Sequence, residues 1–378
     1  MSRDLILIAL SLMTWGLGEG MFYYFSPLYM QQLGASPVMI GAILGGVGMA
    51  MTASFLPAGY ISDRLGRRPL LRLAWLMGVS ATWVMALSRT LPMFVLGIVL
   101  YGATAFVVVP LNSYITAARG KWSVGRALTT ISASFSMGAI LGPLIGGWIG
   151  EKVGLQRTFL VAAVIFIFST LLIFFIRPQP VEPPHPDPNG RGLRGLLLNA
   201  RYTRFLVLVF IVMFCLYLPQ PLSQNFLQNQ RGLNLAQIGQ LISVRYLGVV
   251  LLNLTLGQIN AQAGFLLAQI GVSLFTLLIW KGTGMPWYAL GYLLLGSYQT
   301  ARSLATAQGR SLIHHANMGL GYGMIETMAS MAIILAPPLA GYLYSINPVW
   351  IYPVSLVLIG AAIVITLVFS PIKREEIN

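Results

Sequence analysis

The stretch "GYISDRLGRRPLLR", Gly59 to Arg72, places one acid and four arginines between two strongly apolar segments. Charged residues make up only 8% of the 378-residue chain, so the cluster contrasts with everything around it. Glycines at positions 59 and 66 allow the backbone a tight turn. The stretch is therefore a short, highly charged connection between two apolar segments.

Those apolar segments are long enough to cross a membrane. The chain is 57% hydrophobic with a mean hydropathy of +0.77, whereas a soluble domain is about half apolar and a quarter charged. Apolar runs of roughly 20 residues recur, and in a bilayer such runs must be helical to satisfy their backbone groups. We predict an all-α integral membrane protein with twelve spans, at residues 4–31, 37–62, 69–88, 91–117, 126–149, 157–176, 203–229, 235–258, 264–281, 286–312, 319–345 and 348–371.

The placement of the basic residues predicts the orientation. A net charge of +14 would suit a nucleic-acid-binding protein. However, with the N-terminus in the cytoplasm, sixteen of the 23 Lys and Arg residues fall on the inner side and five on the outer side. This asymmetry is the positive-inside rule. We therefore expect both termini in the cytoplasm, a bacterial plasma membrane location, and no nucleic-acid partner.

The chain divides into two similar halves. The proline-rich segment "RPQPVEPPHPDPNGRGLRG", residues 177–195, separates six spans from six. At a shift of 198, "GASPVMIG" (34–41) aligns with "GLNLAQIG" (232–239), and at 194 "LGPLIGG" (141–147) aligns with "LAPPLAG" (335–341). An even number of spans per half indicates a parallel repeat. We predict bundles at 1–176 and 203–378 joined by a cytoplasmic linker at 177–202.

With these features, the chain resembles the major facilitator superfamily over essentially its whole length. The opening stretch matches that family's loop between helices 2 and 3, G-x-x-x-D-R-x-G-R-R; the matching residues are Gly59, Asp63, Arg64, Gly66, Arg67 and Arg68. The resemblance implies that this loop latches the two halves together on the cytoplasmic side in the outward-open state. The alternative is that the arginines only anchor topology. The second-half loop has Ala261 and Gln262 instead of the acid and arginine, so the latch is one-sided.

Helix 5 carries a second element of this resemblance. It reads "GAILGPLIGG" and resembles the glycine-proline element of the exporting branches; its residues are Gly138, Gly142, Pro143, Gly146 and Gly147. Small residues allow close helix packing, and a proline bends a helix by removing a hydrogen bond. We expect this helix to help seal one side of the protein, with ordinary helix packing as the alternative.

Apart from charges close to the ends of the predicted spans, four charged residues fall clearly inside them, where a charge is costly and is by default a functional hypothesis. From the rise per residue, Glu19 and Arg245 lie near mid-membrane, and Arg302 and Glu326 lie near the cytoplasmic face. Depth therefore suggests an Arg302–Glu326 pair, which could be purely structural, and places Glu19 by the cavity or Arg245. Glu19 stands eight residues before Pro27, which resembles drug–proton antiporters. Because burial favours the neutral form of a carboxyl, we expect Glu19 to exchange protons.

The resemblance also places helices 1, 4, 7 and 10 around a central cavity. Candidate lining residues are Tyr23, Tyr24, Asn112, Gln220, Gln224 and Gln299. They combine aromatic faces with neutral polar groups, which disfavours polyanionic substrates. Helix–helix hydrogen bonds would explain the polar ones equally well.

The sequence thus favours a secondary transporter working by alternating access. We expect proton-coupled export of a small apolar or cationic compound by a monomer in the bilayer, with no metal site and no cofactor beyond the proton as a coupling ion. The alternatives are a facilitator or transporter of lysolipids or sugars, or a non-transporting sensor on the same fold. A membrane enzyme is disfavoured, because the sequence has no nucleotide loop, metal-ligand cluster or nucleophile–base arrangement.

Overall fold

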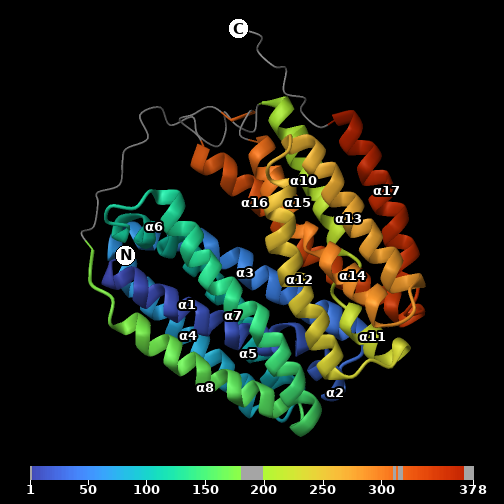
Figure 1. Cartoon of the computed structure of the whole chain (residues 1–378), viewed down its shortest axis with the longest axis horizontal. Coiled ribbons are helices and arrows are strands. Elements are labelled where there is room, and N and C mark those ends of the chain that lie inside the picture. Colours follow the sequence, from blue (N-terminus) through green and yellow to red (C-terminus); the bar gives the residue numbers. More distant parts are fainter. Residues whose placement is uncertain (1, 180–198, 310–311, 314–317, 370–378) are drawn as a thin grey trace. The chain divides into compact units, whose positions relative to one another are not determined.

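The computed structural model describes residues 2–179, 199–309, 312–313 and 318–369, except for the side chains of residues 55–65, 109, 125 and 318–320. Helices account for most of this part of the chain, and it contains no β-strand. The chain divides into two compact units (Figure 1). Unit 1 comprises residues 1–185 and 224–243, and unit 2 comprises residues 186–223 and 244–378.

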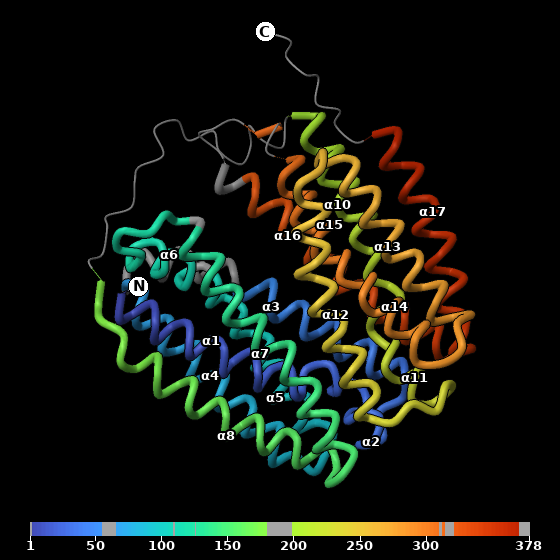
Figure 2. The backbone as a smooth tube through the Cα atoms, in the orientation of Figure 1, coloured from blue at the N-terminus to red at the C-terminus, as the bar shows by residue number. Residues whose placement is uncertain are grey.

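Unit 1 contains the spans of the first half. Its elements are α1 (Arg3–Phe22), the 3-10 turn η1 (Tyr23–Phe25), α2 (Ser26–Gln32), α3 (Pro37–Leu65), α4 (Arg67–Leu87), α5 (Leu91–Ala103), η2 (Thr104–Val107), α6 (Val108–Ala118), α7 (Val124–Val153) and α8 (Leu155–Phe174). Helix α1 packs along α7 and α8, and α4 packs against α8 and α5 (Figure 2). Nearly all of α11 (Ser223–Arg231) and the first part of α12 (Leu235–Leu256) also belong to this unit.

Unit 2 contains most of the second half. Its elements are α10 (Ala200–Tyr217), the remainder of α12, α13 (Ala261–Lys281), α14 (Met285–Leu295), α15 (Ser297–Gly309), α16 (Met318–Ile346) and α17 (Ile351–Phe369). Helix α10 packs against α16 and α17, and α13 packs against α14, α15 and α17. The predicted linker, 177–202, falls largely on residues outside the described part. The division at 1–176, 177–202 and 203–378 therefore stays a prediction.

Eleven segments of the described residues are long and apolar enough to cross a membrane. The remaining predicted span, 286–312, is helical as far as Gly309, but it is divided at Gly296 into α14 and the more polar α15, "SYQTARSLATAQG". Large apolar side chains are exposed on the helices, including Val357 at 72% and Phe168 at 59%. Proteins in water rarely expose apolar surface of this extent, so the exposed faces of these helices suit contact with lipid.

Candidate transport site

Glu19 lies near the end of α1, just before the helix is interrupted. Helix α1 begins at a capping residue, Ser2, whose hydroxyl accepts a hydrogen bond from the Leu5 amide at 3.3 Å. After Phe22 the chain tightens into η1 and continues as α2, with Pro27 in its first turn. Proline is favoured there because it lacks an amide hydrogen and its φ suits a helix start. The interruption leaves the Glu19 carboxylate one turn below a change of helix type.

Two aromatic donors hold this carboxylate. The Tyr101 hydroxyl donates to Glu19 Oε2 at 2.7 Å, and Trp15 Nε1 donates to the same oxygen at 3.1 Å. Trp15 Nε1 also lies 3.1 Å from the Tyr101 hydroxyl oxygen. Among the described residues, no hydrogen bond to Glu19 Oε1 is found. The arrangement therefore fixes one carboxylate oxygen, Oε2, through two neutral donors.

Aromatic rings enclose the cluster. The Trp15 ring packs against Trp75 and Phe166, at centroid separations of 5.0 and 4.4 Å. The Phe22 ring meets Tyr101 edge-on at 5.1 Å. Trp15, Phe22, Trp75 and Tyr101 are all buried. Such packing locks the two donors in place and gives the carboxylate apolar surroundings, in which its interactions are stronger than in water.

The sequence singled out Glu19 but not its partners. Trp15 precedes Glu19 by four residues, and residues at this spacing share a helix face, so a signal for this contact was present. Tyr101 comes from α5, and no local pattern links it to α1. The sequence also placed Glu19 beside the cavity or Arg245; the hydrogen-bond partners observed for Glu19 are Tyr101 and Trp15.

The other predicted cavity residues of unit 1 are partly gathered near this cluster. Tyr23 and Tyr24 pack edge to face at 5.3 Å, and the Tyr23 ring lies 6.4 Å from that of Tyr101. Both side chains are half-buried. Asn112 lies on α6 with an exposed side chain. Tyr23 therefore extends the aromatic surface beside Glu19.

In unit 2 a buried arginine meets a predicted cavity residue. Arg245 on α12 is only 7% exposed, and its Nη2 donates to Gln220 Oε1 at 3.2 Å. The Gln220 amide in turn donates to the Leu216 carbonyl at 2.8 Å. Of the remaining candidates, Gln299 on α15 is exposed, whereas Gln224, which belongs to unit 1, is buried. Arg245 and Gln220 therefore form a second polar site, which belongs to unit 2, whereas the Glu19 site belongs to unit 1.

The ion pair expected from depth, Arg302 with Glu326, is present. Arg302 Nε and Nη2 lie 2.7 and 2.6 Å from Glu326 Oε2, and Nη2 also lies 3.4 Å from the Ser330 hydroxyl. The side chains are 24% and 45% exposed. A half-exposed, well-aligned pair satisfies both charges, which agrees with a structural role.

Helix α7 packs on α1 with the two backbones almost in contact. A Cβ atom added to Gly138 would lie 2.6 Å from the Leu17 amide nitrogen, and one added to Gly142 would lie 2.9 Å from Gly20 Cα. We call Gly138, Gly142 and Gly146 the glycine seam, because a Cβ on any of them would overlap the α1 backbone. The seam fixes the helix that carries Glu19.

A second face of α7 packs equally closely against the first part of α12. A Cβ on Gly147 would lie 2.5 Å from the Leu235 carbonyl oxygen and 3.1 Å from Gly239 Cα. The Ser243 hydroxyl donates to the Ile140 carbonyl at 2.7 Å. The glycine-proline element is thus a two-sided packing surface that joins α12, from the second half of the sequence, to unit 1.

Pro143 lies inside α7, which continues through it from Val124 to Val153. A Cβ on Gly239 would overlap the Pro143 carbonyl oxygen. The expected bend at Pro143 stays a prediction, as does the sealing role of the helix.

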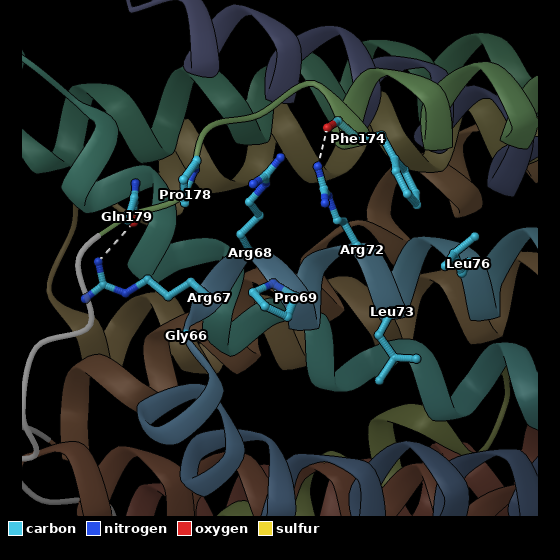
Figure 3. Close-up of a pocket in the computed structure, with 10 residues that line it drawn as sticks. All are labelled: Gly66, Arg67, Arg68, Pro69, Arg72, Leu73, Leu76, Phe174, Pro178 and Gln179. Carbon is cyan, nitrogen blue, oxygen red and sulfur yellow. Dashed lines mark hydrogen bonds between the residues drawn. The ribbon is translucent and has the colours of Figure 1, made fainter.

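Of the charged stretch 59–72, only Gly66 lies outside the helices, because residues 59–65 form the end of α3 and Arg67 begins α4. Gly66 adopts φ +82°, which side-chain-bearing residues rarely tolerate. Arg67 Nη1 donates to Gln179 Oε1 at 3.1 Å, and these two residues line a groove together with Arg68 (Figure 3). The side chains of Asp63 and Arg64, like the surroundings of Gly59, lie outside the described part, so the latch between the halves stays a prediction.

No metal centre is found in the described part of the chain, where no three His, Cys, Asp or Glu side chains converge.

Comparison with known proteins agrees with this architecture. The chain is 25% identical to the multidrug resistance protein MdtG of Salmonella choleraesuis over 312 residues, which cover 78% of this chain and 77% of that protein. It is 26% identical to MdtG of Dickeya zeae over 330 residues, covering 83% and 80%. An uncharacterized MFS-type transporter of Methanocaldococcus jannaschii is 26% identical over 175 residues, so that match spans 46% of this chain and only 45% of that relative.

Solved structures share the fold. A mutant form of the nucleoside transporter NupG superposes with a TM-score of 0.82 at 16% identity, covering 97% of this chain and 98% of that one. A bacterial homolog of the human lysosomal transporter Spinster gives a TM-score of 0.70 at 15% identity, covering 97% and 95%. The sequence pattern of the Major Facilitator Superfamily matches residues 8–300. The chain is a multi-pass membrane protein that belongs to the Major Facilitator Superfamily of transporters.

Proposed function

We propose that this transporter exports small apolar or cationic compounds in exchange for protons, and that Glu19 carries the exchange. One observation supports this most strongly: a carboxylate inside a membrane span has one oxygen held by Tyr101 and Trp15, while Oε1 has no hydrogen bond among the described residues. Glu326 also bonds through one oxygen only, but there a guanidinium group neutralises the charge. Glu19 is held by two neutral donors and has no cationic partner among the described residues.

The exchange depends on competition for Oε1. When Oε1 carries a proton, the side chain is neutral and has no net charge to attract a cation. When the proton leaves, a cationic group can take its place against the charged carboxylate. Because only one of the two can be bound, each passage of the site across the membrane carries either a proton or the substrate. Alternating access between two six-helix halves supplies that movement.

The surroundings of Glu19 favour a lipophilic cation as substrate. The ring of Tyr101, whose hydroxyl donates to Glu19, lies with its centroid 5.1 Å from that of Phe22 and 6.4 Å from that of Tyr23. Aromatic faces attract cations, and they also bury apolar substrate surface. The relatives named multidrug resistance proteins add support from sequence, at about 25% identity.

We also propose a direction of transport and a membrane for this protein. With the basic residues on the cytoplasmic side, both termini would lie in the cytoplasm of a bacterial inner membrane. A proton gradient directed inward would then drive substrate outward.

The experiment is transport into proteoliposomes with and without an imposed pH gradient, using tetraphenylphosphonium as the probe cation. Wild type is expected to accumulate the probe when the lumen is acid. Glu19→Gln should lose this accumulation and keep probe exchange at equal pH. Glu326→Gln is the matched control, because it removes another intramembrane carboxylate, and it should retain gradient-driven accumulation.

The same assay separates the alternatives. Probe movement that ignores the gradient in wild type would indicate a facilitator. Transport of a nucleoside, a sugar or a lysolipid in preference to the cation would overturn the substrate class. Binding without movement of any of them would indicate a sensor.

A further inference from the structure

A groove lies at one end of unit 1, where α4 begins and α8 ends. It has a volume of about 560 Å³, and Figure 3 displays the residues that line it. Three of them are arginines, Arg67, Arg68 and Arg72, and the opposite wall includes Phe174 and Gln179. By the distribution of basic residues this end faces the cytoplasm. The groove shares no residue with the Glu19 cluster, although Gly66, Arg67 and Arg68 also belong to the loop for which a latch is predicted.

The groove concentrates positive charge. Arg67 donates to Gln179, and Arg72 Nη2 donates to the Phe174 carbonyl at 2.6 Å while its guanidinium lies 4.9 Å from the Phe174 ring centroid. The Nε atoms of Arg68 and Arg72 are buried without a hydrogen-bond partner among the described residues. Asp4 lies near the same arginines, because Asp4 and Arg68 both interact electrostatically with the Tyr114 hydroxyl. Among the described side chains, the three arginines of the groove outnumber this acid, so positive charge is in excess.

The same groove continues into an apolar strip. Leu73 and Leu76 follow Arg72 along α4 and are 51% and 45% exposed, and Phe174 on α8 is 37% exposed. Both α4 and α8 are long and apolar enough to cross the membrane. Charge at the end of two spanning helices, directly followed by exposed apolar side chains, matches the change from headgroups to acyl chains in a lipid leaflet.

We propose that this groove binds an anionic phospholipid. Its phosphate would accept charge-assisted hydrogen bonds from Arg68 and Arg72, and an acyl chain would lie along Leu73 and Leu76. Basic pockets at the cytoplasmic ends of spanning helices suit anionic headgroups, and planar guanidinium groups match phosphate oxygens. A free phosphate would leave the apolar strip unused. A zwitterionic lipid would bring its own cation against three arginines.

The test is native mass spectrometry of the full-length protein titrated with phosphatidylglycerol. Removing both guanidinium groups in R68Q/R72Q should lower the affinity of the most tightly bound lipid by about 30-fold, at roughly a factor of five for each basic residue. R126Q is the matched control: Arg126 is an exposed arginine that stacks on Trp122 at the start of α7, at the same end of the bundle but outside the groove. Its affinity should stay within twofold of wild type.

Three further arms complete the test. R68Q alone keeps the Arg72–Phe174 contact and should weaken binding about fivefold, so that loss of fold in the double variant cannot decide the outcome. Phosphatidylcholine and inorganic phosphate, titrated separately, should bind at least tenfold more weakly than phosphatidylglycerol. Equal losses in R126Q and R68Q/R72Q, or equal affinity for phosphatidylcholine, would overturn the proposal.

Discussion

Replacing Gly138 by alanine tests the packing that holds α1. The added Cβ would overlap the Met13 carbonyl and approach the Leu17 amide nitrogen to 2.6 Å. Both neighbours are backbone atoms, so no side-chain rotation can relieve the overlap and α7 must move away from α1. Overpacking of this kind costs about 1–3 kcal/mol. Because only backbone atoms are in the way, we expect the upper part of that range, about 2–3 kcal/mol. Alanine recovers about 1 kcal/mol through its higher helix propensity, so the expected net loss is about 1–2 kcal/mol.

Thermal unfolding in detergent, followed by tryptophan fluorescence, measures this change, and the chain has eight tryptophans. A domain of about 200 residues shifts its Tm by about 2–4 °C per kcal/mol, so Gly138→Ala should lower Tm by about 2–8 °C. Gly46→Ala is the matched control. Gly46 is also helical and belongs to unit 1, but a Cβ there would meet no atom within 4 Å.

The control should leave Tm unchanged or slightly higher. If Gly138→Ala behaves like Gly46→Ala, the close approach of α1 and α7 is wrong. In that case the glycine seam does not position Glu19 either.

Three further predictions follow from contacts within single units. Arg302→Gln leaves Glu326 without its ion partner and should lower stability by about 1–2 kcal/mol at this half-exposed site, and the added change Glu326→Gln should recover part of that loss in the same melting assay. Tyr101→Phe removes the hydroxyl that donates to Glu19 at 2.7 Å. A double-mutant cycle with Glu19→Gln, measured as stability in the same melting assay, should give a coupling free energy of about 1–2 kcal/mol, because hydrogen bonds to charged groups are the stronger ones. A coupling free energy of zero would mean that the bond is absent. Gly147→Ala should separate α7 from α12 and reduce transport several-fold, whereas an unchanged transport rate would argue against a role for this contact in the cycle.

Much of the fold was predictable because the membrane leaves few choices. A run of about 20 apolar residues has to be helical there, and eleven of the twelve predicted spans reappear as such segments in the described part of the chain. The pairing of Arg302 with Glu326 was also predictable, because two opposite charges at similar depth have few other partners.

The rest depended on contacts between distant parts of the sequence. Nothing local links Tyr101 to Glu19, which lies 82 residues away. The repeat places α12 in the second half, but its first part packs on α7 in unit 1. Sequence similarity between the halves reflects how each half folds, whereas this packing depends on complementary small residues on two particular helix faces.

The most direct test of the central claim is the proton released when a cation binds. In weakly buffered detergent solution at neutral pH, tetraphenylphosphonium is added to the protein and a pH-sensitive dye reports the change. Wild type is expected to release up to one proton per bound cation. The Glu19→Gln variant is expected to bind the probe with lower affinity than wild type and to release no proton. Equal proton release from both proteins, or cation binding to wild type without any release, would contradict the assignment of the exchange to Glu19.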